Sequence, residues 1–162
     1  MDSLFHVGGK PFFSIGGQLN NSTSSDPALT EKAFKTCVGL GLNTVAAPVH
    51  WELFEKEEGA YDFAQIDMLM ELARRSGLRL VVLWFGTWKN GNSHYVPEWV
   101  KLQKERFLWA KANDGAEIRA LSPTCEETKK ADMRAFCELC GHIARNNADG
   151  CVIGIQIENE PG

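Results

Sequence analysis

The sequence predicts an α/β fold in which parallel strands alternate with helices. Four apolar segments with strand character are separated by segments of helical periodicity, which is the pattern of successive βα units. Residues 78–85 are almost continuously apolar, as expected of a parallel strand that is covered on both faces. The 162 residues suffice for one ordinary domain, and they contain no tandem repeat, low-complexity stretch or interdomain linker.

The first predicted elements are a hairpin, a strand, a helix and a second strand. Residues 5–13 predict a short hairpin that turns at a pair of glycines, and residues 14–19 predict a first buried strand. Asp26 and Pro27 mark a helix start, because Asp is a good N-cap residue and Pro suits the first helical position. Residues 43–49 predict a second apolar strand.

The same alternation continues along the chain. A second amphipathic helix ends at Gly77 and carries apolar residues at helical spacing, namely Ile66, Leu69, Met70 and Ala73. The third strand, residues 78–85, follows it. Pro97 opens a further helix, and residues 113–115 mark a turn. A last helix with one apolar face precedes a fourth strand at residues 151–158. That face comprises Met133, Phe136, Cys137, Cys140, Ile143 and Ala144.

Two architectures fit four strands separated by helices: an open doubly wound sheet, and four units of a (β/α)8 barrel. Neither a Gly-x-Gly-x-x-Gly motif nor a Walker loop follows any strand, which removes the commonest reasons to choose a nucleotide-binding open sheet. A complete (β/α)8 barrel needs roughly 250 residues. This sequence is therefore long enough for only part of one.

Composition argues against several classes of partner. Lys and Arg number 17 and Asp and Glu 21, and the formal net charge of −4 argues against nucleic acid as the main partner. No apolar run could span a bilayer, and the polar start at Met1 is no signal peptide, so we expect no membrane partner. The five cysteines lack the spacing of a small disulfide scaffold, which suits a reducing compartment. We expect a cytoplasmic protein.

Polar and aromatic residues collect at the predicted carboxyl ends of the four strands. In parallel α/β folds these ends meet at one edge, where binding and catalytic groups gather. The ends supply amides, carboxylates, a lysine, a histidine and tryptophans, and they comprise residues 16–21, 50–52, 84–90 and 158–160. Aromatic rings beside amides and carboxylates suit a sugar, because a pyranose has an apolar face and a rim of hydroxyls.

The end of the fourth strand carries two carboxyl groups. Strand alternation places three isoleucines against the helices and the acidic residues on the opposite face. The two sets are Ile153, Ile155 and Ile157, and Gln156, Glu158 and Glu160. Glycoside hydrolysis requires one carboxyl group as acid and a second as nucleophile or base. On spacing alone, this interpretation and that of two ordinary solvated residues have about equal weight.

Motifs spread along nearly the whole chain carry a family resemblance. They are Gly9-Lys10-Pro11-Phe12-Phe13, Gly17-Gln18-Leu19, Gly41-Leu42-Asn43-Thr44-Val45, Trp51-Glu52-Leu53-Phe54-Glu55, Glu58-Gly59-Ala60-Tyr61-Asp62-Phe63, Val96-Pro97-Glu98-Trp99-Val100 and Gln156-Ile157-Glu158-Asn159-Glu160. In this order they resemble the β-galactosidase-type glycoside hydrolases of families 35 and 42. The resemblance implies a (β/α)8 TIM barrel that cleaves terminal β-galactosides with retention. Residues 1–162 would be its N-terminal half, about four strands, truncated at the C-terminal end.

The resemblance also assigns roles to residues of this sequence. It makes Glu160 the general acid/base and gives Asn159 a contact with the sugar 2-hydroxyl. Glu158 would support Glu160 by raising its proton affinity as a nearby like charge. Candidate sugar contacts are Gln18, Trp51, Trp88 and Asn90. The nucleophile comes from a later strand than these 162 residues contain, so we expect the isolated chain to have little or no glycosidase activity.

Other interpretations remain open at this point. A non-catalytic carbohydrate-binding or self-associating half-barrel module would pair its open sheet edges with another copy, forming a homo-oligomer. An unrelated doubly wound enzyme is disfavoured by the missing phosphate loop. We expect no metal and no cofactor. Cys137 and Cys140 resemble a metal or redox motif, but their place on the apolar stripe predicts core packing. Trp99 and Trp109 have equal odds of being core residues or sugar platforms.

Overall fold

The structure is a computed structural model that describes residues 4–160, and it divides into two compact units. Unit 1 comprises the residues up to Pro48, Ala64–Val82 and Ile143–Ile155, and unit 2 comprises Val49–Phe63, Leu83–His142 and the residues from Gln156 onward. The strands are β1 (His6–Val7), β2 (Lys10–Pro11), β3 (Gly16–Gln18), β4 (Thr44–His50), β5 (Arg79–Phe85), β6 (Trp109–Lys111), β7 (Glu117–Leu121) and β8 (Val152–Gln156). The helices are η1 (Thr23–Ser25), α1 (Pro27–Gly39), α2 (Trp51–Phe54), α3 (Ala64–Ser76), α4 (Glu98–Leu102) and α5 (Glu126–Asn146).

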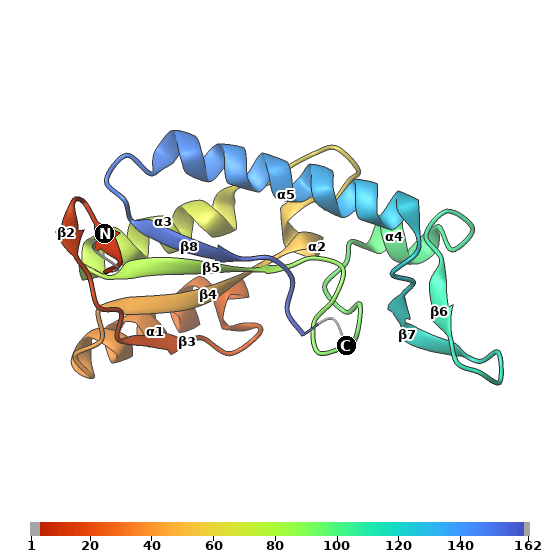
Figure 1. Cartoon of the computed structure of the whole chain (residues 1–162), viewed down its shortest axis with the longest axis horizontal. Helices are drawn as coiled ribbons and strands as arrows, with labels where there is room; N and C mark the ends of the chain where they lie inside the picture. Colours follow the sequence, from red (N-terminus) through yellow and green to blue (C-terminus); the bar gives the residue numbers. More distant parts are fainter. Residues whose placement is uncertain (1–3, 161–162) are drawn as a thin grey trace. The chain divides into compact units, whose positions relative to one another are not determined.

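The main sheet has four strands in the order β3-β4-β5-β8, and all four point in the same direction (Figure 1). The predicted alternation of parallel strands and helices is confirmed. The prediction of a buried first strand is wrong, because Gly16 and Gln18 of β3 are exposed and the nearest buried side chain is that of Leu19. As an edge strand, β3 pairs with β4 alone, and its two glycines offer no side chain to bury.

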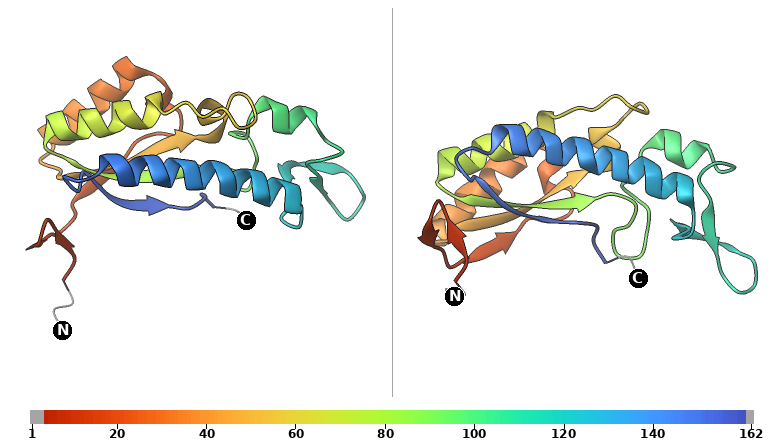
Figure 2. Two further views of the ribbon diagram at one scale, coloured as in Figure 1. Left: turned by 90° about the horizontal axis from the view of Figure 1, so that it is seen from above. Right: turned by 45° about the horizontal axis from the view of Figure 1, so that its top comes forward.

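Unit 1 is organised around helices α1 and α3, which lie side by side (Figure 2). Helix α1 starts as predicted: the Asp26 carboxylate accepts a hydrogen bond from the Leu29 amide at 3.0 Å, and Pro27 occupies the first helical position. The core-facing side of α1 includes Phe34, which is fully buried. On α3, all four apolar residues predicted for its inner face are buried, so this helix is confirmed.

Unit 2 has an aromatic core at the end of β5. The ring of Phe54, from α2, lies perpendicular to the Trp84 ring with 5.7 Å between centroids, and it also packs against Phe63. The turn predicted at residues 113–115 joins β6 and β7 into an antiparallel hairpin. The sequence pattern predicted the turn but not the two strands. Both strands are short, and about half of their residues are exposed.

Helix α5 buries a different face from the predicted one. Of the predicted apolar residues, Ile143 is buried, whereas Met133, Cys137 and Ala144 are exposed. The interpretation of Cys137 as a core residue is therefore wrong, and Cys140 is only half-buried. The buried positions run at helical spacing and include small and polar residues beside two large apolar ones, and they are Thr128, Ala131, Asp132, Ala135, Leu139 and Ile143. Small side chains at these positions let the helix backbone lie close to its neighbours.

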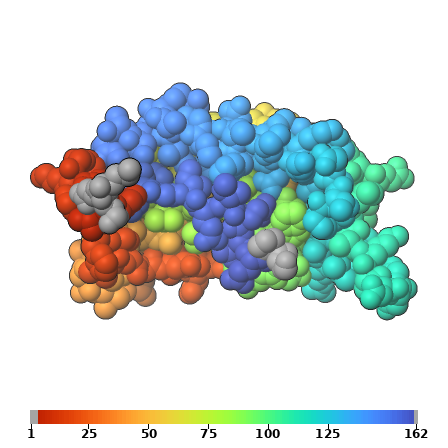
Figure 3. Space-filling model, in the orientation of Figure 1, coloured from red at the N-terminus to blue at the C-terminus, as the bar shows by residue number. Residues whose placement is uncertain are grey.

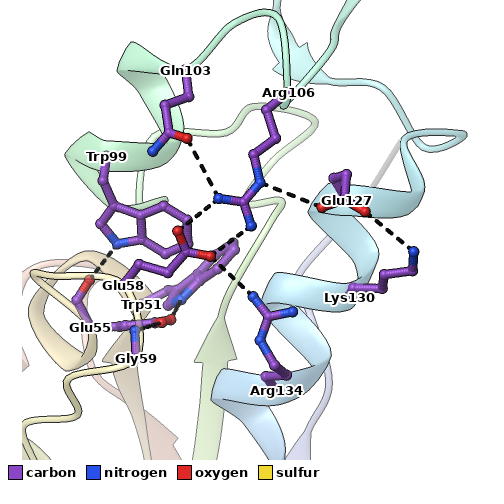
Figure 4. Close-up of polar contacts among 10 residues, drawn as sticks. All are labelled: Trp51, Glu55, Glu58, Gly59, Trp99, Gln103, Arg106, Glu127, Lys130 and Arg134. Atoms are coloured by element: carbon purple, nitrogen blue, oxygen red, sulfur yellow. Dashed lines mark hydrogen bonds and ion pairs between the residues drawn. The ribbon is translucent and has the colours of Figure 1, made fainter.

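A cluster of ion pairs connects distant segments of unit 2 (Figure 4). The guanidinium group of Arg106 donates to both carboxylate oxygens of Glu58, each at 2.7 Å, and also to Glu127 at 3.4 Å. Arg134 adds a contact to Glu58 at 3.3 Å. The hydrogen bonds from Arg106 lower the pKa of Glu58. Helix α5 is thereby tied to two loops of the same unit by bidentate, charge-assisted contacts.

Among residues 4–160, no helix is both long and apolar enough to cross a membrane.

The cap of α1 gives a test of this local structure. We expect Asp26→Ala to lower the free energy of unfolding by about 1 kcal/mol, because the Leu29 amide loses its acceptor. Urea unfolding followed by circular dichroism measures the change. Asp26→Ser retains an N-cap oxygen and should stay close to the parent chain. Equal losses in the two variants would contradict the capping role.

Candidate active site

The carboxyl ends of β5 and β8 meet within unit 2. The β5 loop, residues 86–91, follows β5, and the β8 end, residues 157–160, follows β8. Two backbone hydrogen bonds join them: the Asn90 amide donates to the Asn159 carbonyl at 3.1 Å, and the Gly91 amide donates to the Glu160 carbonyl at 2.7 Å. Figure 3 shows the β8 end, in dark blue, against the green residues of this loop. The main chain that carries Asn159 and Glu160 is therefore held by the β5 loop.

Glu160 presents its carboxyl group to solvent beside a buried cation. Its side chain is 68% exposed, and Oε1 lies 4.0 Å from Nζ of Lys89, whose side chain is only 7% exposed. The Lys89 ammonium lies 5.3 Å from the centre of the Phe85 ring and donates to the Asn90 side chain. An accessible carboxyl group and a positive charge fixed beneath it thus share one edge of the site.

Asn159 is buried but not satisfied. Its side chain is 7% exposed, and its Oδ1 atom has no hydrogen-bond partner among the described residues. A buried carbonyl oxygen without a donor carries a free-energy cost on the order of 1–3 kcal/mol. Such atoms are rare in folded proteins and are commonly explained by water, an ion or a ligand. Asn159 therefore has a buried acceptor without a donor, directly before Glu160 in the sequence.

Glu158 points toward the β5 loop. Its Oε1 accepts a hydrogen bond from the Thr87 amide at 2.9 Å, and its Oε2 accepts one from the Trp88 amide at 2.8 Å. Burial, as the largest cause, and then the interaction with the neighbouring Asp132 carboxyl group together raise the pKa of Glu158 to about 9. Glu158 is consequently protonated at neutral pH.

This geometry corrects two predictions made from the sequence. Strand β8 ends at Gln156, and Glu158 and Glu160 have φ angles of 57° and 51°, so strand alternation does not extend through these acids. Ile157, which alternation placed against the helices, is 68% exposed. A protonated Glu158 carries no negative charge, so the predicted role as a like charge beside Glu160 does not fit this arrangement.

Asp132 is a site residue that sequence reasoning missed. Its Oδ1 accepts from the Trp84 indole at 2.7 Å, and its Oδ2 accepts from the Thr87 amide at 2.8 Å and the Thr87 hydroxyl at 2.5 Å. The sequence did contain a signal for Asp132. It is an acidic residue on the same side of α5 as the small residues Ala131 and Ala135. Apolar periodicity alone gives no weight to such a position.

Gly86 makes the approach of α5 to the β5 loop possible. A methyl group at this position would lie 2.7 Å from each carboxylate oxygen of Asp132 and closer still to the Trp84 indole nitrogen. These distances are shorter than side-chain carbons tolerate. The Trp84-Phe85-Gly86-Thr87 segment therefore requires glycine for packing rather than for backbone conformation.

A cavity of about 350 Å³ adjoins the two acids. Its walls include Trp84, Trp88, Phe136 and Ile157, and Glu158 and Asp132 lie at its edge. The aromatic walls reduce hydration of the two carboxyl groups, which is the physical origin of the burial effect on Glu158.

The predicted sugar contacts lie in different surroundings. Trp51 is fully buried, and its indole donates to Glu55 at 2.6 Å (Figure 4), so it is part of the core and not an accessible platform. Burial raises the pKa of the Glu55 carboxyl. Trp88 is half-buried and lines the cavity, Asn90 is exposed in the β5 loop, and Gln18 is exposed on β3 in unit 1.

Trp99 and Trp109, which the sequence left with equal odds of being core residues or sugar platforms, are both half-buried. Trp99 packs edge-on against Trp51 and donates to the Glu55 carbonyl at 2.9 Å, which makes it part of the core of unit 2. The indole nitrogen of Trp109 is buried without a hydrogen-bond partner among the described residues, and Lys104 lies over its ring at 5.6 Å.

The raised pKa of Glu158 predicts a pH dependence of stability. Its ordinary pKa is near 4.5, so the folded chain retains a proton there that the unfolded chain has lost at neutral pH. This contribution to the free energy of unfolding is fully present below about pH 4.5 and is lost as the pH rises through about 9. We expect Glu158→Gln, which stays neutral, to flatten that decline in urea unfolding measured across this range. The exposed Glu126→Gln should leave the decline unchanged, and an unaltered profile in Glu158→Gln would contradict the assignment.

The packing at Gly86 gives a second test. We expect Gly86→Ala to lower the free energy of unfolding by about 1–3 kcal/mol, because Asp132 and Trp84 must move. Gly39→Ala is the matched control, since a methyl group there meets nothing within 4 Å. That control should be neutral or stabilise the chain by up to about 1 kcal/mol. Thermal unfolding of both variants separates the effects, and an unchanged Gly86→Ala midpoint would refute the close contact.

The comparisons with known proteins agree on the kind of enzyme. The family model for glycosyl hydrolases family 35 matches residues 4–162. A β-galactosidase from Xanthomonas manihotis is 24% identical over 157 residues, which cover 95% of this chain and 24% of that protein. An exo-β-D-glucosaminidase from Pyrococcus horikoshii is 28% identical over 140 residues, or 75% of this chain and 17% of that protein. The chain thus spans about a quarter or less of the length of these relatives.

The solved structures that resemble this chain show the same fold. The exo-β-1,4-mannosidase Op5Man5 from Opitutaceae bacterium strain TAV5 matches 98% of this chain and 27% of its own, with a TM-score of 0.69 and 19% identity. The catalytic domain of a Paenibacillus polymyxa β-amylase matches 86% of this chain and 35% of its own, with a TM-score of 0.63 and 21% identity. Both are TIM-barrel glycosidases, so the predicted partial (β/α)8 barrel is confirmed. With its motifs and the family model in agreement, the chain belongs to glycosyl hydrolase family 35.

Proposed function

We propose that this chain is part of the catalytic barrel of a retaining glycoside hydrolase that acts on terminal β-galactosides. Membership of family 35 supports glycoside hydrolysis, and the similarity to a protein named β-galactosidase supports galactose as the sugar. The pairing of an exposed carboxyl group at Glu160 with an unsatisfied amide oxygen at Asn159 supports the location of the site.

The observation that carries the proposal is the free Oδ1 atom of Asn159. It is buried, lacks a donor among the described residues and lies one residue before Glu160. The oxygen is enclosed by its neighbours, so a sugar hydroxyl reaches it when the β8 end shifts, and its donation then restores the missing hydrogen bond. In the proposed mechanism this is the 2-hydroxyl, whose hydrogen bond strengthens as the transition state forms.

Glu160 is the proposed acid/base. It donates a proton to the glycosidic oxygen as the leaving group departs, and it later removes a proton from the water that hydrolyses the glycosyl-enzyme intermediate. The nucleophile of this mechanism is a carboxylate on another strand of the barrel, outside these 162 residues. On this proposal the isolated chain binds a galactoside without hydrolysing it.

Binding and hydrolysis can be measured separately on the 162-residue chain. Titration with methyl β-D-galactopyranoside, followed by backbone amide NMR, should shift the signals of residues 89–91 and 159–160. Asn159→Ala should weaken binding by about tenfold, as expected for one lost hydrogen bond in a buried site. The exposed Asn113→Ala, on the β6–β7 turn, should bind as the parent chain does.

The same preparation tests which sugar the chain prefers and whether the isolated chain is inactive. Equal titrations with the β-mannoside and the β-glucosaminide decide whether the galactoside is preferred, and tighter binding of either would overturn the galactose assignment. Hydrolysis of a chromogenic β-galactoside should be undetectable. Measurable turnover that Glu160→Gln abolishes would show that the chain holds its own nucleophile.

A further inference from the structure

Asp132 and Glu158 approach each other at a single backbone amide. The Thr87 N–H donates to Oδ2 of Asp132 at 2.8 Å and to Oε1 of Glu158 at 2.9 Å. Because one N–H binds an oxygen of each acid, the two carboxyl groups lie close together, and burial and the neighbouring Asp132 raise the pKa of Glu158. They come from α5 and from the β8 end, so the β5 loop is placed between two acids from separate elements.

Two carboxyl groups that accept from one N–H lie close enough to favour retention of a proton between them. Two ionised carboxylates in contact repel each other, and one of them therefore retains a proton well above the usual range, as in known carboxyl pairs. The other donors to this pair are all neutral: the Trp84 indole, the Thr87 hydroxyl and the Trp88 amide. Among the described residues, no arginine or lysine donates a hydrogen bond to either acid. Such a positive charge would allow both acids to ionise.

The other titratable groups nearby occupy different positions. Cys125, directly before α5, and Lys129, in its first turn, line the same cavity. Lys89 follows Trp88 in the β5 loop, but its ammonium lies over the Phe85 ring and near Glu160. The charge that acts on Glu158 is that of Asp132.

The pair sits where the main chain is strained. Glu158 and Glu160 both have left-handed φ angles, which non-glycine residues adopt only when surrounding contacts hold them there. Such a conformation costs on the order of 1 kcal/mol for each residue. The contacts that hold it are the backbone bonds to Asn90 and Gly91 on one side and the side chain of Glu158 on the other.

We propose that Asp132 is a positioning residue, which holds one proton in common with Glu158 and thereby fixes the strained β8 end that carries Asn159 and Glu160. In the described structure the hydrogen bonds of Asp132 run to Trp84 and Thr87, and none joins it to Asn159 or Glu160. It acts through Glu158, because the shared proton turns a repulsion between two acids into a hydrogen bond. Only the roles of Asn159 and Glu160 in this proposal rest on the proposed function.

The proton can be followed directly in the 162-residue chain. Carbon-13 NMR of the side-chain carboxyl groups gives the titration of Glu158 without any sugar. In the parent chain we expect Glu158 to titrate near 9. In Asp132→Asn its pKa should fall by about 2 or more, because the amide carries no charge and can donate to an ionised Glu158. Glu126→Gln, at the first residue of the same helix, should leave this titration unchanged.

Sugar binding provides the second measurement. If the shared proton positions the β8 end, methyl β-D-galactopyranoside should bind the parent chain about tenfold more weakly once the pH exceeds the pKa of Glu158. Asp132→Asn should lose this pH dependence. A merely structural role for Asp132 would lower the unfolding temperature but leave the titration of Glu158 in place.

The outcomes separate this proposal from the proposed function. A parent Glu158 that titrates near 4.5, or an unchanged Glu158 pKa in Asp132→Asn, would overturn the shared proton. Absence of sugar binding at any pH, with the carboxyl titrations as expected, would overturn the proposed function and the positioning role but not the shared proton. Should Asp132→Asn fail to fold, Thr87→Val removes one donor to ionised Asp132, so the pair should hold its shared proton more tightly and titrate at higher pH, while Thr87→Ser should restore the parent titration.

Discussion

The arrangement of the candidate site depends on the contact between α5 and the end of β5 through Asp132. One carboxylate accepts three hydrogen bonds, one from Trp84 and two from Thr87, and this is possible because Gly86 has no side chain to keep the helix away. Burying an acid in this way is favourable only when its hydrogen bonds are satisfied. The same contact holds the Thr87 amide where it can also bind Glu158.

Much of the fold could be predicted because it depends on short-range patterns. Asp26 and Pro27 form the helix start that their preferences predict, and the apolar spacing of α3 matches its buried face. Predictions failed where burial is decided by neighbours in three dimensions. Edge position leaves β3 exposed, and α5 buries alanines and an acid while Met133 remains outside. Hydrophobicity along the chain cannot rank these positions, since the buried face of the helix includes alanines and Asp132 as well as Leu139 and Ile143.

The candidate site was predictable in location but not in detail. The prediction that the strand ends meet at one edge is correct for the β5 loop and the β8 end, which are hydrogen-bonded to each other. This closeness follows from the parallel topology of the sheet. The same reasoning included Trp51, which is a core residue bonded to Glu55, because an aromatic residue at a strand end can face either way. It omitted Asp132, which reaches the site from the middle of a helix that precedes β8. Side-chain direction was the missing information in both cases.

Glu158 and Glu160 show why spacing in sequence cannot assign roles to paired acids. They are separated by one residue, and simple alternation would have given them the same surroundings. The left-handed φ at Glu158 removes that equivalence. One carboxyl group then enters an aromatic, poorly hydrated position beside a second acid, and the other stays exposed over the ammonium of Lys89. A buried acid whose pKa is raised, next to an exposed acid, is the division of environment by which a fold can give two carboxyl groups different roles. Because that division rests on a strained backbone, the contacts that maintain the strain are, on the proposed function, as important to the chemistry as the proposed acid/base itself.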